Sequence, residues 1–530
     1  MNNAEDALDV ASEVMFDIMD GEKAKLRFEN LPDARRKSIS NLREADRNKL
    51  LKIPAIVRNV GDKEGKLKKA VYVCKSCGTR FKEVENPEKP LECQGCGKSN
   101  NKTRFVLDED RSEYEDIQKI KVQEPTENLE GGKQPDSIIA VLKDDLVGEV
   151  HGGERVDLNA ILKMKKKSRS SNFKKYLKIN NIEMKEKPFQ AIDLTEEDRK
   201  EIEELKEEGN VLDKIHRSIA PDVFGLEKEK MAIALQLFRG VRKKINRSNR
   251  RGDIHILLIG DPGTAKTVLI KSVADLAPKS MFKSGKGASG AGLTATAVRD
   301  EEMGGWVIKA GVLPLCDGGL ACIDEIDKMS DEDREYMNDA MGSAQIIPIA
   351  KGGEEVELQS RTSVLAAGNP KYGRFDSHEE VTNQIDLDPT LISRFDYIFP
   401  LYDQPSKFPD HDDKTTDHMA EMHMKTKDED IAPIDDDLLR KYIAHARQIR
   451  PEFKENSMEK LTDFFKDMRK ASDEAMSITR RQFDTLVRTS EASARMRLSE
   501  KVEREDVDRA IELFLYFIDK VAKDSSGNID

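Results

Sequence analysis

The sequence lacks several features that would assign it to a particular class of protein. It has no apolar run long enough to span a bilayer, no N-terminal apolar segment of the signal-peptide type, and no internal repeat. It has no basic excess either: 101 acidic residues face 89 basic ones, for a formal net charge of −12. We therefore expect a cytoplasmic protein without a membrane partner, in which any nucleic-acid surface is local.

Cysteine is scarce, and its spacing is informative. Of six cysteines, four form two CxxC pairs, and Cys316 and Cys322 lie singly near a predicted strand. In a reducing compartment this usage favours metal binding over disulfides. The length of 530 residues predicts two or three domains, and the charged fraction of 36% indicates a highly solvated chain.

The strongest motif is a stretch that reads IHILLIGDPGTAKT and occupies residues 254–267. Its apolar first half predicts a buried strand of a parallel sheet, and the Gly-Pro-Gly turn leads into a helix. In loops of this kind backbone N–H groups cradle phosphates, the lysine reaches the terminal phosphates, and the next hydroxyl holds Mg²⁺. The predicted nucleotide-binding residues are Gly260, Asp261, Pro262, Gly263, Thr264, Ala265, Lys266 and Thr267.

One position departs from the strict pattern, which has glycine before the lysine where this chain has Ala265. We explain the alanine by the start of the helix, where alanine fits. The alternative interpretation of this stretch is a chance Gly-Pro turn before a core helix.

Two further strands end in polar residues that phosphoryl transfer requires. The apolar run 320–323 ends in Asp324, which would orient Mg²⁺, and Glu325, which would polarise the attacking water. The run 362–368 ends in Asn369, which could hold that water against the γ-phosphate. The alternative for the first run is a strand that ends at an exposed Asp-Glu turn, but a phosphate loop earlier in the chain makes that a poor explanation.

The N-terminal third contains regularly spaced short β-like runs from Ile53 onward, which predict a small barrel or sandwich. Within it lie two tight pairs, Cys74 with Cys77 and Cys93 with Cys96. Four thiolates give the tetrahedral shell of a structural zinc and leave no open position for a catalytic one. The alternative, free surface thiols, does not explain the paired spacing.

A concentrated basic segment follows, with no acidic residue in it. Alternation on either side of residues 170–172 predicts a hairpin that carries charge at its tip and contacts phosphates without reading sequence. The alternative is a solvated charged loop. The basic residues are Lys163, Lys165, Lys166, Lys167, Arg169, Lys174, Lys175 and Lys178.

Together these motifs resemble the archaeal minichromosome maintenance (MCM) helicases of the AAA+ class, from about Leu26 to the C-terminus. The alanine before Lys266 is also usual in this family. The matching segments are SIAPDVFG (218–225), GDPGTAKT (260–267), GLTATAVRD (292–300), GGLACIDEIDKMS (318–330), RTSVLAAGNP (361–370), LISRFD (391–396) and ITRRQFDTLVRTSEASARMRL (478–498).

The resemblance implies a multidomain fold. It predicts an N-terminal OB-type β-barrel with an inserted zinc ribbon and a C-terminal α/β AAA+ P-loop ATPase with a helical lid. The expected divisions are a short N-terminal helical remnant (1–50), the OB-fold DNA-binding domain (51–187) with its zinc ribbon (73–98), a linker helix (188–215), the ATPase core (216–402) and the lid (403–530).

The resemblance also implies an ATP-dependent DNA helicase or translocase, a hexameric ring that encircles DNA and unwinds it during replication. Its cofactors would be ATP, Mg²⁺ and Zn²⁺. Its partners would be single-stranded and forked DNA, identical or related subunits and replication loading factors, at a nucleoid-associated location.

Particular residues inherit roles from the family motifs. Lys266, Glu325 and Asn369 would act within one subunit. Arg394 resembles the arginine finger and Arg481 the second sensor, and both would reach a neighbour's nucleotide. The DNA-binding residues would be Lys163, Lys165, Lys166, Lys167 and Arg169 in the N-terminal hairpin, and Lys351 at the tip of a hairpin over 345–359; residues 292–312 resemble the helix-2 insertion.

The chain also departs from the family pattern. The segment 342–345 replaces a Glu-Gln-Gln run with one more residue, and Glu354 and Glu355 add negative charge beside Lys351. Compared with the family pattern, we expect this sequence to lack most of the N-terminal helical domain and the C-terminal winged helix. An alternative is therefore an MCM-like paralogue that binds ATP and DNA as an accessory ring subunit with weak or no unwinding. A remote third, an AAA+ remodeller of proteins, conflicts with the zinc-bearing barrel and the basic hairpin.

Overall fold

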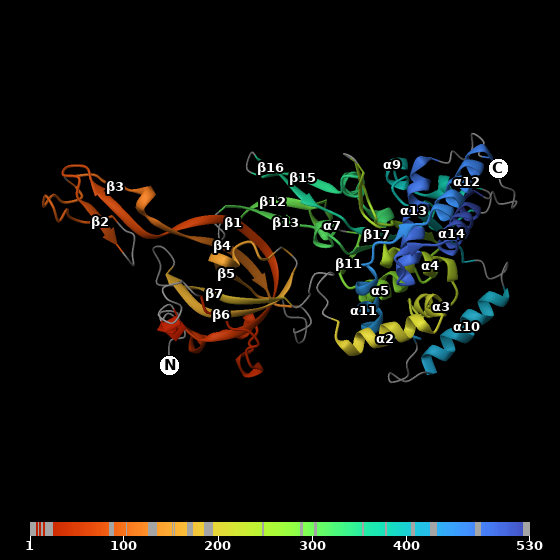
Figure 1. Ribbon diagram of the computed structural model, residues 1–530, viewed down its shortest axis with the longest axis horizontal. Coiled ribbons are helices and arrows are strands. Elements are labelled where there is room, and N and C mark those ends of the chain that lie inside the picture. The colour runs from red at the N-terminus through yellow and green to blue at the C-terminus, as the bar shows by residue number, and fades with distance from the viewer. Residues whose placement is uncertain are drawn as a thin grey trace. The chain divides into compact units, whose positions relative to one another are not determined.

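The computed structural model divides the chain into two compact units, Met1–Glu186 with Ala297–Lys309, and Lys187–Thr296 with Ala310–Asp530 (Figure 1). The structure describes residues 7–8, 10–11, 14–15, 25–83, 89–101, 103–125, 135–150, 152, 154–166, 173–184, 194–245, 248–286, 290–300, 305–351, 354–376, 379–403, 409–424, 432–471 and 479–522.

Helix is assigned at residues 7–8, 10–11 and 14–15, within the expected helical remnant 1–50. The segment 25–49 is built differently. It contains three single 3₁₀ turns, Asp33–Arg35, Ile39–Asn41 and Glu44–Asp46. Asn30 and Asn48 flank these turns with φ of 52° and 60°, in the left-handed region that interrupts a helix. The chain here follows the surface of the barrel instead of packing as a helix of its own.

The first unit is built on a closed five-stranded barrel, in which β6 pairs back to β1. Residues 53–60 and 68–74, which look like two separate short runs in the sequence, belong to one long strand, β1. This strand bends at register shifts such as that between Val57 and Asn59. Among the described strand pairs of this barrel, β5 and β7 are parallel and the others antiparallel. The expected β-barrel is confirmed. In pairing order its strands are β1 (Leu50–Cys74), β4 (Glu113–Gln123), β5 (Ser137–Lys143), β7 (Phe173–Met184) and β6 (Arg155–Lys166).

The far end of β1 carries a small subdomain with a core of its own. There β1 pairs with β2 (Arg80–Glu83) and β3 (Phe105–Leu107). Phe81 and Phe105 pack edge to face with ring centroids 5.7 Å apart. The two CxxC pairs lie beside this core.

The hairpin of β12 (Ala295–Asp300) and β13 (Gly305–Ala310) corresponds to the expected helix-2 insertion. Its residues Ala297–Lys309 group with the first unit and not with the ATPase core, in which the sequence places them. Val60 of β1 is paired with Ile308 of β13.

The second unit is built on a five-stranded parallel sheet. Because the strands run in parallel, their carboxyl ends meet at one edge, where α/β proteins bind ligands. Helix α5 (Lys266–Leu276) packs on β14 and β17, and α4 (Glu227–Phe238) on β10. In order across the sheet, the strands are β11 (Ser280–Ser284), β14 (Leu320–Asp324), β17 (Ser363–Gly368), β10 (Ile256–Gly260) and β18 (Tyr397–Leu401).

Helices cover the rest of the second unit. Thr195 caps α2 (Glu196–Glu207) through a capping box with Asp198, within the expected linker segment 188–215. The expected P-loop ATPase domain with a helical lid is confirmed. Lid helices α11 (Asp436–Ala446), α12 (Glu455–Ala471), α13 (Arg480–Met496) and α14 (Arg504–Ala522) follow α10 (Pro409–Met424). Within the described part of the chain, no helix has the length and apolarity to cross a membrane.

The remaining elements are short. They are the 3₁₀ turns Glu109–Arg111, Asp144–Leu146, Ile326–Lys328 and Val381–Gln384, helices α3 (Val211–Arg217), α6 (Gly290–Leu293), α7 (Val312–Leu315), α8 (Asp331–Ala340) and α9 (Pro389–Ile392), and strands β8 (Lys243–Ile245), β9 (Ser248–Arg250), β15 (Ile346–Lys351), β16 (Glu354–Gln359), β19 (Glu452–Phe453) and β20 (Lys501–Val502).

Candidate active site

A cavity of about 480 Å³ opens at the carboxyl edge of the parallel sheet. It gathers most of the residues that the sequence predicts for nucleotide binding, together with the polar ends of β14 and β17. The lining residues are Pro262, Gly263, Thr264, Ala265, Lys266, Thr267, Val268, Asp324, Glu325, Gly368 and Asn369.

The loop that forms one wall of the cavity contains two left-handed residues, Gly263 at φ 91° and Ala265 at φ 56°. Left-handed positions of this kind turn successive N–H groups to one side and form an anion-binding nest. The prediction that Ala265 fits as a helical residue is wrong, because this residue is the left-handed N-cap and not the first helical residue. An alanine here carries a strain that glycine would avoid.

Lys266 is buried at the start of α5, and its amine has three partners within the loop. Nζ donates to the carbonyls of Gly260 and Asp261, both at 2.7 Å, and to Oγ1 of Thr264 at 3.2 Å. Burial lowers the pKa of Lys266, while the carboxylates of Asp261 and Asp324 act in the opposite direction. An incoming phosphate would compensate this charge better than carbonyl dipoles do.

Asp324 and Glu325 occupy different environments at the end of β14. Oδ2 of Asp324 accepts a hydrogen bond from Oγ1 of Thr267 at 2.6 Å. Oε2 of Glu325 accepts from Oγ of Ser284 at 2.9 Å, and Oε1 is paired with Lys328. Lys328 and then Ser284 lower the pKa of Glu325, so this carboxylate is ionised at neutral pH.

Ser284 is a site residue that sequence reasoning does not find. It ends β11 directly opposite Asp324 in the parallel register, so the sheet brings it to Glu325. The only signal in the sequence is its place at the end of a short β-like run before a Gly-rich segment.

Two predicted nucleotide-binding residues, Gly260 and Asp261, are outside the cavity lining. The Asp261 carboxylate instead accepts the backbone N–H groups of Phe375 at 2.8 Å and Asp403 at 3.0 Å. Asp261 therefore braces the loop from behind. Asn369 does line the cavity, and its backbone N–H donates to Oδ1 of Asp327 at 3.1 Å.

Arg394 and Arg481 lie close to one another and outside the cavity lining of their own chain. Arg394 donates from Nε to Oδ1 of Asn338 at 2.9 Å. Arg481, at the start of α13, donates from Nη1 to the carbonyl of Ser393 at 2.6 Å and to its Oγ at 2.7 Å. Burial, and then the nearby charge of Arg481, lower the pKa of Arg394.

The two CxxC pairs bring four sulfur atoms within 4.8 Å of one another. The Sγ atoms of Cys74 and Cys96 are 3.9 Å apart, and those of Cys77 and Cys93 are 3.4 Å apart. A hydrogen bond from Thr103 leads the effects that lower the pKa of Cys74 to about 6. At Cys96 the amide of Lys98 lowers the pKa, but burial and the neighbouring thiols raise it to about 12. Clustered thiols resist joint ionisation, and a divalent cation relieves this repulsion, so the cluster fits a metal ion.

The predicted basic hairpin is formed by β6 and β7, and its described residues have mixed roles. Lys165 is exposed and faces Lys174 across the two strands. Lys163 donates to Oδ1 of Asn48 at 2.9 Å, and Lys175 to the carbonyl of Leu42 at 2.8 Å, so both hold the segment before the barrel. In the backbone register, Lys178 is opposite Ile161, and Lys166 is opposite Phe173.

Several predicted DNA contacts fall outside the described residues. Lys167 and Arg169 lie outside the described part of the chain, and so does the side chain of Lys166. Lys351 ends β15 opposite Glu354 in the backbone register, but its side chain is also outside that part.

The parallel sheet, its left-handed phosphate loop, the acidic end of β14 and the helical lid define a P-loop ATPase of the AAA+ type. Comparison with known proteins agrees. Family models of the MCM OB domain, the MCM P-loop domain and the MCM AAA-lid domain match residues 38–166, 198–423 and 437–518. The chain belongs to the MCM family of ATP-dependent replicative DNA helicases.

Relatives from two domains of life align over most of the chain. It is 39% identical to the minichromosome maintenance protein MCM of Saccharolobus solfataricus, over 96% of this chain and 76% of that protein. It is 32% identical to the DNA replication licensing factor MCM2 of Oryza sativa subsp. indica, over 96% of this chain and 56% of the relative. It is 33% identical to the DNA replication licensing factor mcm7 of Schizosaccharomyces pombe, over 90% of this chain and 65% of that protein. The chain thus spans less than two thirds of these two eukaryotic relatives.

Proposed function

We propose that the protein is one subunit of a hexameric ring that hydrolyses ATP at subunit boundaries and unwinds DNA during replication. The observation that carries the proposal is the division of the site. Lys266, Glu325 and Asn369 line one cavity, while Arg394 and Arg481 lie together outside it. A site that lacks its arginines within one chain is completed when a neighbour supplies them.

The residues of the cavity have separate roles in this proposal. Lys266 leaves its carbonyl partners and binds the terminal phosphates. Thr267 and Asp324, already joined by a hydrogen bond, would hold Mg²⁺, which would neutralise phosphate charge. Glu325, ionised beside Lys328, polarises the attacking water, and Asn369 positions it. The neighbour's arginines stabilise the charge of the transition state.

The cysteine cluster holds a structural Zn²⁺ in this proposal, because Cys74, Cys77, Cys93 and Cys96 supply a complete tetrahedral set. The ion would fix the ribbon 73–98 at the end of the barrel domain 51–187. The linker 188–215 would join this domain to the core 216–402 and the lid 403–530.

DNA contacts are assigned to two hairpins. Lys163, Lys165, Lys166, Lys167 and Arg169 would bind phosphates from the barrel, and Lys351 from the β15–β16 hairpin. Single-stranded and forked DNA are the expected partners, with identical or related subunits in the ring, loading factors and a nucleoid-associated location in the cytoplasm.

One observation favours a second candidate, an accessory ring subunit with weak unwinding. In the backbone register of β15 and β16, Lys351 is opposite Glu354 and Ala350 is opposite Glu355, so two acidic residues share these strand positions with the proposed DNA contact. Carboxylates beside DNA oppose phosphate binding.

Strand displacement on a forked duplex with ATP distinguishes the two candidates. The helicase proposal expects displacement that requires ATP and disappears in Lys266→Ala. ATP hydrolysis and DNA binding without displacement would support the accessory subunit. Absence of both hydrolysis and DNA binding would overturn both.

A further inference from the structure

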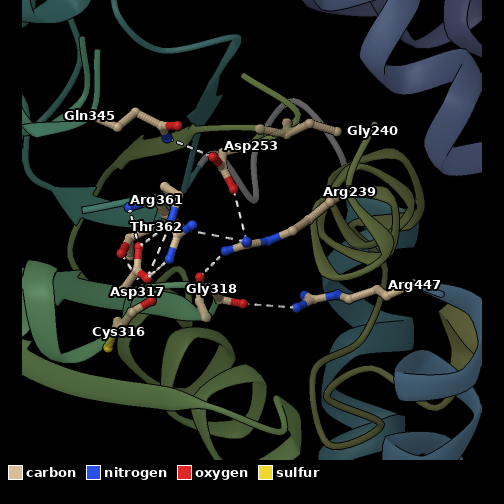
Figure 2. Close-up of polar contacts among 12 residues, drawn as sticks. Arg239, Gly240, Asp253, Cys316, Asp317, Gly318, Gln345, Arg361, Thr362 and Arg447 are labelled. Atoms are coloured by element: carbon tan, nitrogen blue, oxygen red, sulfur yellow. Dashed lines mark hydrogen bonds and ion pairs between the residues drawn. The ribbon is translucent and has the colours of Figure 1, made fainter. Parts of the chain in front are cut away.

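The β15–β16 hairpin joins the rest of the unit at two points, called here its first foot (Gln345) and its second foot (Arg361). A buried side-chain amide fixes the first foot. Gln345 immediately precedes β15, has φ 55°, and is fully buried. Its Nε2 donates to Oδ2 of Asp253 at 2.6 Å, and its carbonyl accepts the N–H of Ser360 at 2.8 Å. Oδ1 of the same Asp253 pairs with Nη1 of Arg239 at 2.9 Å (Figure 2). The base of the hairpin is therefore held by a charged, buried carboxylate.

The second foot is fixed by a fork-shaped ion pair. Arg361, two residues after β16, donates its backbone N–H to Oδ1 of Asp317 at 2.7 Å and Nε to the same atom at 2.8 Å, while Nη2 reaches Oδ2. The carbonyl of Arg361 accepts the N–H of Gly318 at 2.9 Å. Paired donors of this kind fix direction as well as distance.

Arg239 joins the two feet. Besides Asp253, its guanidinium reaches the carbonyl of Arg361 at 3.4 Å and the carbonyl of Gly319. Figure 2 shows this side chain between the Gln345–Asp253 pair and the Arg361–Asp317 pair. Arg239 holds this position at φ 59°, in the left-handed region.

The partners of the hairpin belong to the three central strands of the sheet. Asp253 lies just before β10, Gly319 immediately before β14, and Arg361 just before β17. The carboxyl ends of the same strands carry the phosphate loop, Asp324 and Asn369. Each strand is short and buried along its whole length, so it transmits displacement with little deformation. The hairpin feet and the ATP cavity are thus opposite ends of the same three strands.

The electrostatics make this arrangement rigid. Burial raises the pKa of Asp253, but Arg239 and then Gln345 outweigh that effect and lower it, so the carboxylate stays ionised inside the protein. A buried charge that loses a partner is strongly destabilised, so movement at one foot is resisted by the whole cluster.

We propose that Gln345 and Asp253 are positioning residues that couple the β15–β16 hairpin to ATP hydrolysis. The inference rests on the proposed function, in which Lys351 of this hairpin contacts DNA. Neither residue lines the ATP cavity. Both act through the strands, and their loss should lower the DNA movement obtained per ATP hydrolysed while hydrolysis itself persists.

The test uses the full chain with Gln345→Met, which keeps the length of the side chain and removes the amide donor. Base pairs displaced per ATP hydrolysed should fall about tenfold, the loss expected for one hydrogen bond to a charged group. Basal ATP turnover and the KM for ATP should stay within about twofold, because the cavity is unchanged. Gln359→Met, the same change at an exposed position of β16, should leave the coupling intact.

The second variant keeps a cation beside Asp253, so that no buried charge is left unpaired. Arg239→Lys loses the guanidinium fork that reaches the carbonyls of Arg361 and Gly319, and with it the bridge between the feet. It should uncouple in the same way. Normal coupling in both variants, with melting temperatures like that of the wild type, would overturn the inference, as would an equal loss of basal hydrolysis.

A double-mutant cycle with Lys351→Ala separates this inference from the proposed function. Where the hairpin contacts DNA, Lys351→Ala uncouples by itself, and adding Gln345→Met should then cause no further loss. If Lys351→Ala lowers the coupling but Gln345→Met does not, only the positioning role of Gln345 is rejected. Full coupling in Lys351→Ala rejects the DNA contact and with it the route proposed here.

Discussion

The hydroxyl of Thr267 donates to Oδ2 of Asp324 at 2.6 Å and so joins the phosphate loop to the end of β14. The two residues are far apart in the sequence but share one proposed task, the holding of Mg²⁺. In the proposed function these two side chains would hold Mg²⁺ where the start of α5 meets the acidic end of β14. Both are already side by side in the cavity, whereas Lys266 would still have to exchange its carbonyl partners for phosphate.

Hydrolysis should require Lys266 and Glu325 for different reasons. Lys266→Ala leaves phosphate charge uncompensated, so ATP binding and turnover should both be lost. Glu325→Gln keeps the shape but not the charge, so the variant should bind ATP and reduce kcat by about 10²-fold or more. Nucleotide-binding titration and steady-state kinetics measure the two effects separately. Wild-type turnover in either variant would remove the proposed site.

The pH dependence of hydrolysis should report Glu325. Its pKa lies below the ordinary glutamate value because of Lys328 and Ser284, so kcat should fall only when the pH drops below the range usual for a glutamate. Lys328→Met removes the main cause, and the acid limb of the kcat profile should move to higher pH. The matched variant Lys371→Met, which lies outside this cluster, should not shift it. If the acid limb does not move in Lys328→Met, the ionisation of Glu325 does not determine the pH dependence of kcat.

The strands that carry the site are predictable from the sequence because each is a continuous apolar run ending in its functional residue. The phosphate loop, Asp324 and Asn369 follow from this rule. Ser284 does not, because only the parallel register brings it opposite Asp324. The bracing role of Asp261 is hidden for the same reason, since its partners lie more than a hundred residues further on.

Two other features of the structure could not be predicted, one for a local and one for a long-range reason. Ala265 matches a helix start in the sequence, but the loop needs a left-handed residue there. The sign of φ cannot be predicted from an alanine in the sequence. Gln345 reads as part of a departure from the family pattern. Its structural role depends on Asp253, 92 residues earlier, and on the burial of both. A contact between two residues so far apart in the sequence leaves no periodic pattern of apolar residues from which it could be predicted.

The four cysteines should hold one zinc ion per chain. Structural zinc contributes on the order of 10 kcal/mol to small domains. Cys74→Ser should unfold the ribbon and weaken ring assembly or DNA binding, while ATP binding in the second unit persists. Metal analysis of the purified protein and a chelator titration check this. A wild-type protein without zinc would contradict it.

DNA binding should be electrostatic and indifferent to sequence. Neutralising Lys165, Lys166 and Lys167 together should weaken single-strand affinity and flatten its salt dependence, by roughly 0.7 in log–log slope for each phosphate that the protein no longer neutralises. Lys200→Ala, at an exposed position of the acidic helix α2, serves as the control for removal of a surface lysine. A slope unchanged in the triple variant would make the patch a solvated loop.

The ATP site should be shared between subunits. Arg394 is absent from the lining of its own cavity and is held by Asn338. An arginine supplied by a neighbour can raise kcat about 10³-fold or more, so Arg394→Ala should assemble and bind ATP yet hydrolyse little.

Mixing experiments decide whether the arginine acts in trans. Inactive Arg394→Ala combined with inactive Lys266→Ala should recover part of the activity, because some interfaces then pair an intact phosphate loop with an intact arginine. Mixtures of Lys266→Ala with Glu325→Gln are the control, since both changes lie in the same cavity and no interface then combines an intact lysine with an intact glutamate. The recovered rate should peak at intermediate mixing ratios and vanish at either extreme, as the number of complete interfaces does. If no ratio recovers activity although mixed rings form, each chain completes its own site, and the ring mechanism proposed for this protein fails.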